Sequence, residues 1–352
     1  MDKMPSWTLK FQEAFRDSET LSNFLGWKTS EKVTKIYPVF IPRDLAQRMK
    51  DEGQNGVLAR EFFPDEAELI DQGYLDPIGD KKFNVAPQII HRYPNRVLFT
   101  ATSVCPVHCR YCFRKNELSP NDEIFETDFE KTLNYLRDHA EVSEIIFTGG
   151  DPLTLTDAKL DRTLEAFSKI SHIKDIRFHT RYPAILPERI DEGFVGLLNK
   201  WSRHFRTISL AVHANHVKEF SCASKSALKL LAGARIQLLS QTVLLKNVND
   251  SEKALTELME FFVDHKVRPY YLHHPDQVRG GMHFYLSLEE GRSLYHSLRK
   301  NLPGWAIPQY VIDVPGGHGK IPAANPEAHS YSGNLLSLSG ETISISEPHA
   351  QV

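Results

Sequence analysis

Short apolar runs alternate with longer amphipathic segments over the central part of this chain. Six runs are rich in β-branched residues and have the length of strands: 97–100, 144–147, 176–179, 207–212, 237–245 and 269–272. Between them, apolar residues recur at helical spacing over 128–140, 160–170, 194–201, 227–232 and 255–265. Strands that alternate with helices are typical of a parallel sheet. The pattern therefore predicts an α/β protein whose six strand–helix units curl into a partial (β/α)6 TIM-like barrel.

The two ends of the chain carry different patterns. Residues up to about 90 are charged and show helical spacing, with Trp7, Phe11 and Phe15 on one apolar face. We expect a helical N-terminal extension over 1–90, the barrel over 91–300, and a C-terminal segment over 301–352.

The composition is that of an ordinary globular protein. Hydrophobic residues make up 41% and charged residues 25% of the 352 positions, and the net charge is −3. This charge gives no basic footprint for nucleic acid, and no apolar run reaches the roughly 18 residues of a membrane span. Residues 1–15 lack the apolar stretch of a signal peptide. With four cysteines, we expect no disulfide framework and a reducing cytoplasm, and the isolated Cys222 is expected to be a small buried residue.

Three of the cysteines, Cys105, Cys109 and Cys112, stand in a C-x3-C-x2-C pattern. Three thiolates on one loop can hold three irons of a cubane 4Fe-4S cluster and leave the fourth iron open to a substrate. Ferredoxin and zinc sites need a fourth ligand, and His108 is too cramped inside the triplet to supply it. The alternatives are three incidental cysteines or a partial zinc site.

Polar residues follow several of the predicted strands. Gly149, Gly150 and Asp151 come after the second strand, where two glycines allow the backbone to approach a ligand closely. The third, fourth and fifth strands end near 179–181, His213 and Gln241. Each of these alone can be a satisfied polar residue at a strand end, but together they indicate a polar cavity at the C-terminal face of the barrel.

A glycine-rich segment over 313–320 ends in Lys320. It is not a phosphate-binding P-loop, because Val314 and Ile321 stand where that motif needs Gly and Ser or Thr. A lysine here can be a solvated surface residue. It can also form a Schiff base with pyridoxal phosphate, which serves as the electron sink in amino-acid chemistry.

The chain resembles the radical S-adenosylmethionine aminomutases typified by lysine 2,3-aminomutase. The resemblance runs from about His91 to Lys320 through HRYPNRVLF, CPVHCRYCFRK, FTGGDPL, TRYPAILPERI, HANH, QTVLLKNVND, YYLHHPD and DVPGGHGK, in family order. It implies a radical SAM barrel with a 4Fe-4S cluster, S-adenosylmethionine and pyridoxal 5'-phosphate. A 5'-deoxyadenosyl radical would then drive a 1,2-amino shift that interconverts L-lysine and L-β-lysine. It further implies a homo-oligomer served by an electron donor such as flavodoxin or ferredoxin.

The resemblance also assigns roles to individual residues. It implies that Lys320 attaches pyridoxal phosphate and that Arg92 and Arg96 hold the phosphate group, a task that suits guanidinium forks. It implies that Arg114 binds the substrate carboxylate and that Asp276 and Asp313 receive the side-chain ammonium of lysine. The residues implied to bind S-adenosylmethionine are Gly149, Gly150, Asp151, His213 and Gln241.

The sequence departs from the family pattern at two points. No cysteine follows Cys222, so the C-terminal zinc cluster of the clostridial type is absent, and His273 stands where that type has tyrosine. In this segment the chain is more similar to the relatives that supply β-lysine for elongation factor P. Three alternatives therefore stay open: the same chemistry dedicated to that modification, an aminomutase for another amino acid, or a non-catalytic iron-sulfur electron carrier.

Overall fold

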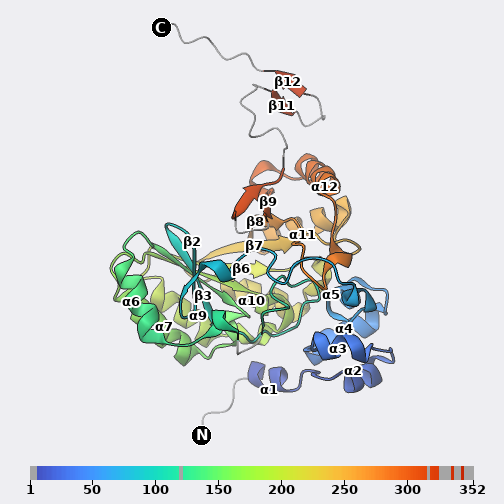
Figure 1. The fold of residues 1–352 in the computed structure, drawn as a ribbon, viewed down its shortest axis with the longest axis horizontal. Coiled ribbons are helices and arrows are strands. Elements are labelled where there is room, and N and C mark those ends of the chain that lie inside the picture. The colour runs from blue at the N-terminus through green and yellow to red at the C-terminus, as the bar shows by residue number, and fades with distance from the viewer. Residues whose placement is uncertain (1–5, 119–121, 315–317, 325–333, 337–341, 345–352) are drawn as a thin grey trace.

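The computed structural model describes residues 6–118, 122–314, 318–324, 334–336 and 342–344. Its centre is a ten-stranded sheet whose strands follow one another in sequence order (Figure 1). Consecutive pairs from the third to the ninth strand are parallel, and the outer strands are antiparallel. The strands are β1 (Asn84–Ala86), β2 (Ile89–Tyr93), β3 (Arg96–Thr102), β4 (Glu144–Gly149), β5 (Asp175–Thr180), β6 (Thr207–His213), β7 (Gln237–Val243), β8 (Arg268–His273), β9 (Gln309–Asp313) and β10 (Lys320–Pro322).

A helix connects each parallel strand to the next and lies outside the curved sheet (Figure 1). These helices are α6 (Phe129–Asp138), α7 (Asp157–Ser168), α9 (Glu192–Trp201), α10 (Cys222–Ala232), α11 (Glu252–Asp264) and α12 (Leu288–Asn301). Each begins after an Asp, Ser or Thr whose side chain accepts a backbone N–H of the first turn. The predicted partial (β/α)6 TIM-like barrel is confirmed, and all six predicted strands lie within or overlap β3 to β8.

The strands present alternate residues to two different environments. On β4, Ile145 and Phe147 are fully buried against the helices, whereas Glu144 and Ile146 line a cavity inside the barrel. The same alternation continues on β5, where Arg177 and His179 line the cavity while Ile176 and Phe178 are buried in the core. Phe147 illustrates the outer packing, with its ring 4.6 Å from that of Phe178 on β5.

The two edges of the barrel approach each other through side chains. Tyr93 on β2 accepts a hydrogen bond from the backbone N–H of Lys320 on β10, at 2.7 Å. Arg92 Nη1 lies 3.5 Å from Asp313 Oδ1 at the end of β9. These contacts bring the two edges of the sheet together in the lining of one cavity. A separate pair, β11 (Asn334–Leu336) and β12 (Thr342–Ser344), is antiparallel.

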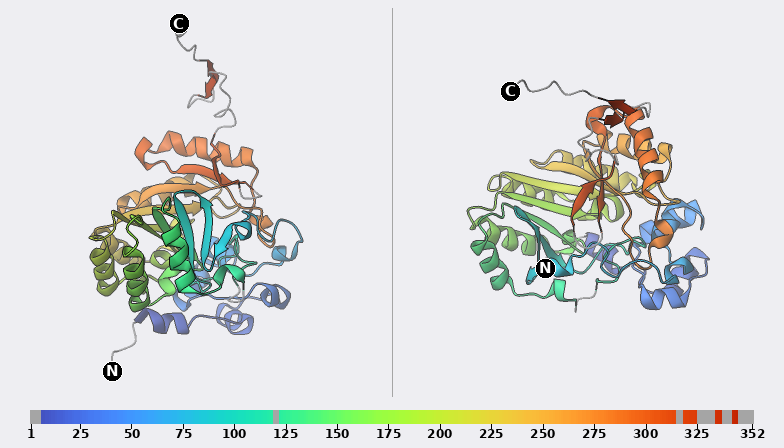
Figure 2. Two further views of the ribbon diagram at one scale, coloured as in Figure 1. Left: turned by 60° about the vertical axis from the view of Figure 1, so that its left-hand side comes forward. Right: turned by 45° about the horizontal axis from the view of Figure 1, so that its top comes forward.

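Five helices form the N-terminal segment and gather at one side of the barrel (Figure 2). They are α1 (Ser6–Gln12), α2 (Ser18–Leu25), α3 (Glu31–Ile36), α4 (Arg43–Glu52) and α5 (Val57–Phe62). Trp7 and Phe15 are buried as predicted, but α1 ends at Gln12, and Phe15 instead forms a β-bridge with Ile41. The predicted helical character also stops before residue 90, because β1 and the start of β2 already belong to the sheet.

The prediction that Cys222 is buried is wrong. Cys222 is exposed because it is the first residue of α10, directly after the capping Ser221, on the solvent side of the helix. In the described part of the chain, no helix is long and apolar enough to cross a membrane.

Candidate active site

A cavity of about 700 Å³ occupies the inside of the barrel. Its lining includes residues at the carboxyl ends of the strands, such as Thr148, Thr180 and Gln241, and residues at their amino ends, such as Arg96, Glu144 and Gln237. Every residue that the sequence predicted for the site lines this one cavity: Arg92, Arg96, Cys105, Cys109, Cys112, Arg114, Gly149, Gly150, Asp151, His213, Gln241, Asp276, Asp313 and Lys320.

The cysteine loop follows β3, and the N-terminal segment holds it in place. The backbone N–H of His108 donates to Phe40 O and that of Arg110 to Glu61 O, both at 2.9 Å. The Arg110 guanidinium donates to Glu68 at 2.9 Å from Nε. His108 Nδ1 lies 2.9 Å from Pro38 O, so the N-terminal segment also engages the ring of this histidine.

The three cysteines are free and half-buried. Burial raises the pKa of the Cys112 thiol to about 12, so iron binding would have to release protons from the thiols. Among the described side chains, no three His, Cys, Asp or Glu groups converge on a point where they could hold a single metal ion. Three cysteines around one cavity therefore fit a cluster in which each thiolate binds its own iron.

The glycine turn after β4 packs directly against the strand that leads into the cysteine loop. Gly149 has φ +105°, a conformation that other residues rarely adopt. A Cβ atom on Gly150 would lie 2.5 Å from Val104 O. Asp151 is buried, and its carboxylate accepts hydrogen bonds from Leu153 N, Thr180 Oγ1 and Arg181 N. The turn thus joins β4 to β5 and to the cysteine loop.

We expect Gly150→Ala to lower the iron content of the purified protein, because the added methyl group must displace the backbone at Val104. The matched control is Gly196→Ala in α9, where a Cβ would meet nothing within 4 Å. That change should leave iron binding intact and stabilise the fold by about 0.5–1 kcal/mol, because alanine favours a helix interior over glycine. Iron assays and thermal denaturation measure both effects. Equal iron content in the two variants would contradict this role of the turn.

A buried carboxylate that the sequence did not single out joins two of the predicted arginines. Asp80 accepts a hydrogen bond from Arg92 on one oxygen and from Arg114 on the other. Arg114 is 2% exposed, and its Nε and Nη1 have no hydrogen-bond partner, although Glu117 Oε2 lies 3.6 Å from Nη1. Such buried, unpartnered donors are costly unless a ligand completes them, so Arg114 is suited to bind an anion in the cavity.

Asp313 and Lys320 are opposite each other in the register of β9 and β10, and this pairing brings their side chains together. Lys320 Nζ lies 2.7 Å from Asp313 Oδ2. Gly319 precedes Lys320 with φ +81°, and a Cβ there would lie 2.6 Å from the Tyr93 hydroxyl. Residues 315–317 of the glycine-rich segment lie outside the described residues.

The surroundings of Lys320 include a second acid and a neutral histidine. Burial, followed by the charge of Asp313, raises the pKa of Asp276 to about 7. His273 Nδ1 lies 3.9 Å from Asp313 Oδ2, but burial and the charge of Lys320 hold the pKa of His273 well below its usual range. The histidine is therefore uncharged at neutral pH, and this end of the cavity combines two carboxyl groups with one lysine.

Three other predicted residues line the cavity with different partners. Arg96 donates to Asn95 at 3.0 Å and stacks over the Tyr93 ring at 3.9 Å. His213 Nε2 lies 3.2 Å from the Tyr111 hydroxyl, and burial keeps its pKa well below the usual range. Gln241 lies beside His213 in the register of β6 and β7.

The comparisons with known proteins agree with this arrangement. Residues 99–259 match the model of the radical SAM superfamily. An L-lysine 2,3-aminomutase of Methanococcus maripaludis is 33% identical over 92% of this chain and 76% of its own length. The L-lysine 2,3-aminomutase of Escherichia coli is 32% identical over 90% of this chain and 94% of its own length. That of Clostridium subterminale is 32% identical over 78% of this chain and 66% of its own length.

A partial barrel with a three-cysteine loop at the carboxyl ends of its strands defines a radical S-adenosylmethionine enzyme. Within that class, the chain belongs to the lysine 2,3-aminomutase family. Membership implies a 4Fe-4S cluster and S-adenosylmethionine, and an amino acid as substrate.

Proposed function

We propose that this protein is an isomerase that interconverts L-lysine and L-β-lysine, with pyridoxal phosphate attached to Lys320. The observation that carries the proposal is the contact between Lys320 Nζ and Asp313 Oδ2. Asp313 already accepts an alkylammonium ion of the type that a lysine substrate carries. Asp276 lies close enough for the charge of Asp313 to contribute to the raised pKa of Asp276. Two acids with one neutral histidine favour a cationic side chain and disfavour an acidic one.

Arg114, in contrast, favours a negatively charged group of the substrate. Its unpartnered Nε and Nη1 are available to the carboxylate of an amino acid, while Asp80 fixes the guanidinium through Nη2. An anion site and a cation site on the walls of one cavity match the two charged ends of lysine. The protein would thereby orient the substrate and exclude water from the reacting carbons.

The cofactor set fits the same cavity. When bound, the cluster and S-adenosylmethionine supply a carbon radical, and pyridoxal phosphate supplies an electron sink for the migrating nitrogen. Lys320 offers the amine for pyridoxal phosphate, and Arg92 and Arg96 are the cations on the same wall for its phosphate. The segment 149–151, His213 and Gln241 surround the cysteine end, where we propose that S-adenosylmethionine binds.

Borohydride reduction tests the proposed attachment. Peptide mapping of the reduced protein loaded with pyridoxal phosphate should identify Lys320 as the modified residue, because among the described residues it is the lysine that lines the cavity. The matched control is Lys200, a surface lysine paired with Asp161, which should stay unmodified. Modification of a different lysine, or none in fully loaded protein, would refute the assignment.

The proposal also predicts a pH dependence. Asp276 must be ionised to attract the lysine ammonium, and its pKa of about 7 means that it loses its proton between pH 6 and 8. The substrate ammonium, with a usual pKa of about 10.4, stays charged over this range. Below this pKa the carboxyl group of Asp276 is neutral and attracts the substrate ammonium weakly, and above it the group is charged. We therefore expect kcat/KM for lysine to rise about tenfold from pH 6 to pH 8.

Other groups have a pKa in this window as well, among them Asp151, whose buried carboxyl group has a pKa of about 6, and Glu117. Burial raises the pKa of Glu117 to about 7, and in its ionised form it would compete with the substrate carboxylate for Arg114. The Glu117→Gln variant should therefore keep the rise of kcat/KM or steepen it. If instead the rise disappears in Glu117→Gln, or is absent from the unmodified enzyme, Asp276 does not control lysine binding.

A further inference from the structure

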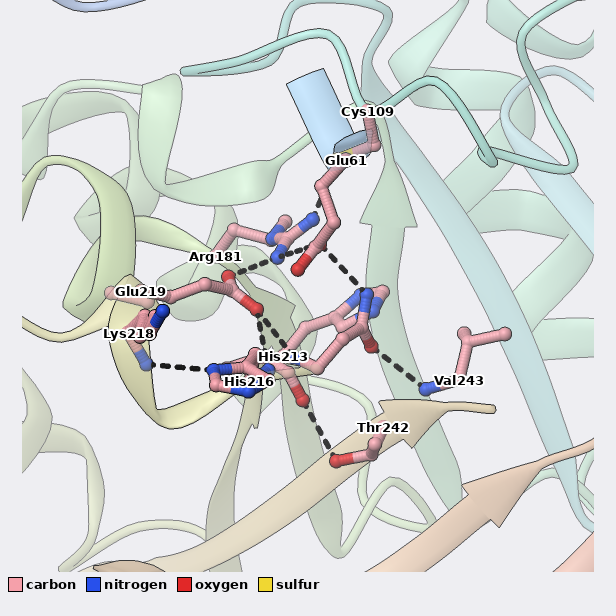
Figure 3. Close-up of polar contacts among 12 residues, drawn as sticks. Glu61, Cys109, Arg181, His213, His216, Lys218, Glu219, Thr242 and Val243 are labelled. Atoms are coloured by element: carbon pink, nitrogen blue, oxygen red, sulfur yellow. Dashed lines mark hydrogen bonds and ion pairs between the residues drawn. The ribbon is translucent and has the colours of Figure 1, made fainter. Parts of the chain in front are cut away.

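Arg181 lies directly after β5, at the cysteine end of the cavity, and is 6% exposed. Its Nη1 donates to Cys109 Sγ at 2.8 Å and to the Tyr111 hydroxyl. Its Nη2 donates to Glu219 and lies 3.5 Å from Glu61 Oε2 (Figure 3). The four hydrogens of the two terminal nitrogens therefore have four protein acceptors, one of which is a cysteine sulfur.

The two carboxylates behind Arg181 come from distant parts of the chain. Glu61 belongs to α5 of the N-terminal segment, and Glu219 ends the short 3-10 helix Val217–Glu219 after β6. Both are 0% exposed. Glu219 Oε1 accepts the backbone N–H groups of Asn215 and His216. Asn215 Nδ2 donates to Glu61 Oε2 at 3.1 Å, so one network fixes the guanidinium from two sides.

We propose that Arg181 is a positioning residue for the cluster that the proposed function requires: it orients Cys109 and raises the reduction potential of the cluster. Gaining one electron makes the cluster more negative, and an N–H donor with a positive charge at a ligating sulfur stabilises that reduced state. The electron comes from an external low-potential one-electron donor. The N-terminal segment contributes to this tuning through Glu61, which helps to hold the guanidinium against the sulfur.

The contacts argue against a role for Arg181 as a ligand of S-adenosylmethionine. Its four terminal hydrogens are already used by protein acceptors, and its Nε is buried without a partner. Arg114 differs at its terminal nitrogens, because its Nη1 has no hydrogen-bond partner. The terminal nitrogens of Arg181 therefore bind protein groups, two of which, Cys109 Sγ and the Tyr111 hydroxyl, belong to the cysteine loop.

The test is a redox titration of the cluster in the absence of S-adenosylmethionine, in which electron paramagnetic resonance measures the reduced cluster. In Arg181→Gln the loss of the charged donor should lower the ratio of reduced to oxidised cluster at a fixed potential by about tenfold. This equals about 59 mV for a one-electron couple. Arg181→Lys keeps the charge and should recover part of the shift. The control is Arg189→Gln, which removes a buried guanidinium bonded to Leu153 O and Asp157 rather than to a cysteine, and should leave the midpoint unchanged.

Two further results decide the remaining cases. A normal midpoint and iron content in Arg181→Gln, combined with weaker binding of S-adenosylmethionine, would overturn the proposal. If that variant does not fold, pulsed resonance on the unmodified protein carrying guanidino-15N arginine should detect a coupled nitrogen at the reduced cluster, and its absence would also overturn the proposal. If the unmodified enzyme forms β-lysine and Arg181→Gln has an unshifted midpoint, only this inference is refuted. If the unmodified protein binds no iron, the proposed function itself is refuted.

Discussion

Alanine at any one of Cys105, Cys109 or Cys112 should abolish formation of 5'-deoxyadenosine from S-adenosylmethionine. The three thiols line one cavity, and the Nδ1 of His108, the histidine inside the triplet, is bonded to Pro38 O. A cubane held by two protein thiolates loses iron and cannot accept the electron that starts the reaction. Iron analysis and chromatography of anaerobic reactions measure the loss.

The fourth cysteine gives the matched control for these substitutions. Cys222 is exposed on α10, and Cys222→Ala should retain iron and full formation of 5'-deoxyadenosine. A triple alanine variant of the loop that still produced 5'-deoxyadenosine would show that the cluster lies elsewhere.

Asparagine at Asp276 or Asp313 should lower kcat/KM for lysine by roughly a hundredfold to a few thousandfold. Removing one partner of a desolvated charge pair typically costs about 3–5 kcal/mol, which corresponds to that range. Asp276→Asn is the cleaner test, because Asp313 also contacts Arg92 and Lys320. Cluster content and uncoupled formation of 5'-deoxyadenosine should stay near normal in Asp276→Asn.

A surface acid supplies the comparison for the two aspartates. Asp161 pairs with Lys200 at the protein surface, where such pairs contribute about 0–1 kcal/mol, so Asp161→Asn should keep normal lysine kinetics. Normal lysine kinetics in both Asp276→Asn and Asp313→Asn would require a different location for the side-chain ammonium.

The sequence predicted the central strands well because they are continuous apolar runs that leave a clear periodic signal. Strands β3 to β8 and helices α6, α7, α9, α10 and α11 were found in this way. The edges of the barrel were missed for physical reasons. β1 has three residues and no buried side chain, and α12 buries only Gly291 and Leu298, so neither leaves an apolar pattern.

The residues of the candidate site also differ in how well the sequence predicts them. Its cysteines, glycines and Lys320 stand in compact motifs that can be read locally. Asp80 is joined to Arg114 across 34 residues, and Glu61 to Arg181 across 120, so their roles depend on the fold and leave no local signature. Cys222 was misassigned because an isolated cysteine carries no information about which side of a helix it occupies.

The most direct measurement is product identification after anaerobic incubation of the protein with a reductant, S-adenosylmethionine, pyridoxal phosphate and either L-lysine or L-glutamate. Two carboxyl groups lie beside Lys320, and Arg114 is available for the substrate carboxylate. We therefore expect β-lysine from lysine and little turnover of glutamate. Faster turnover of glutamate than of lysine would contradict the proposed function.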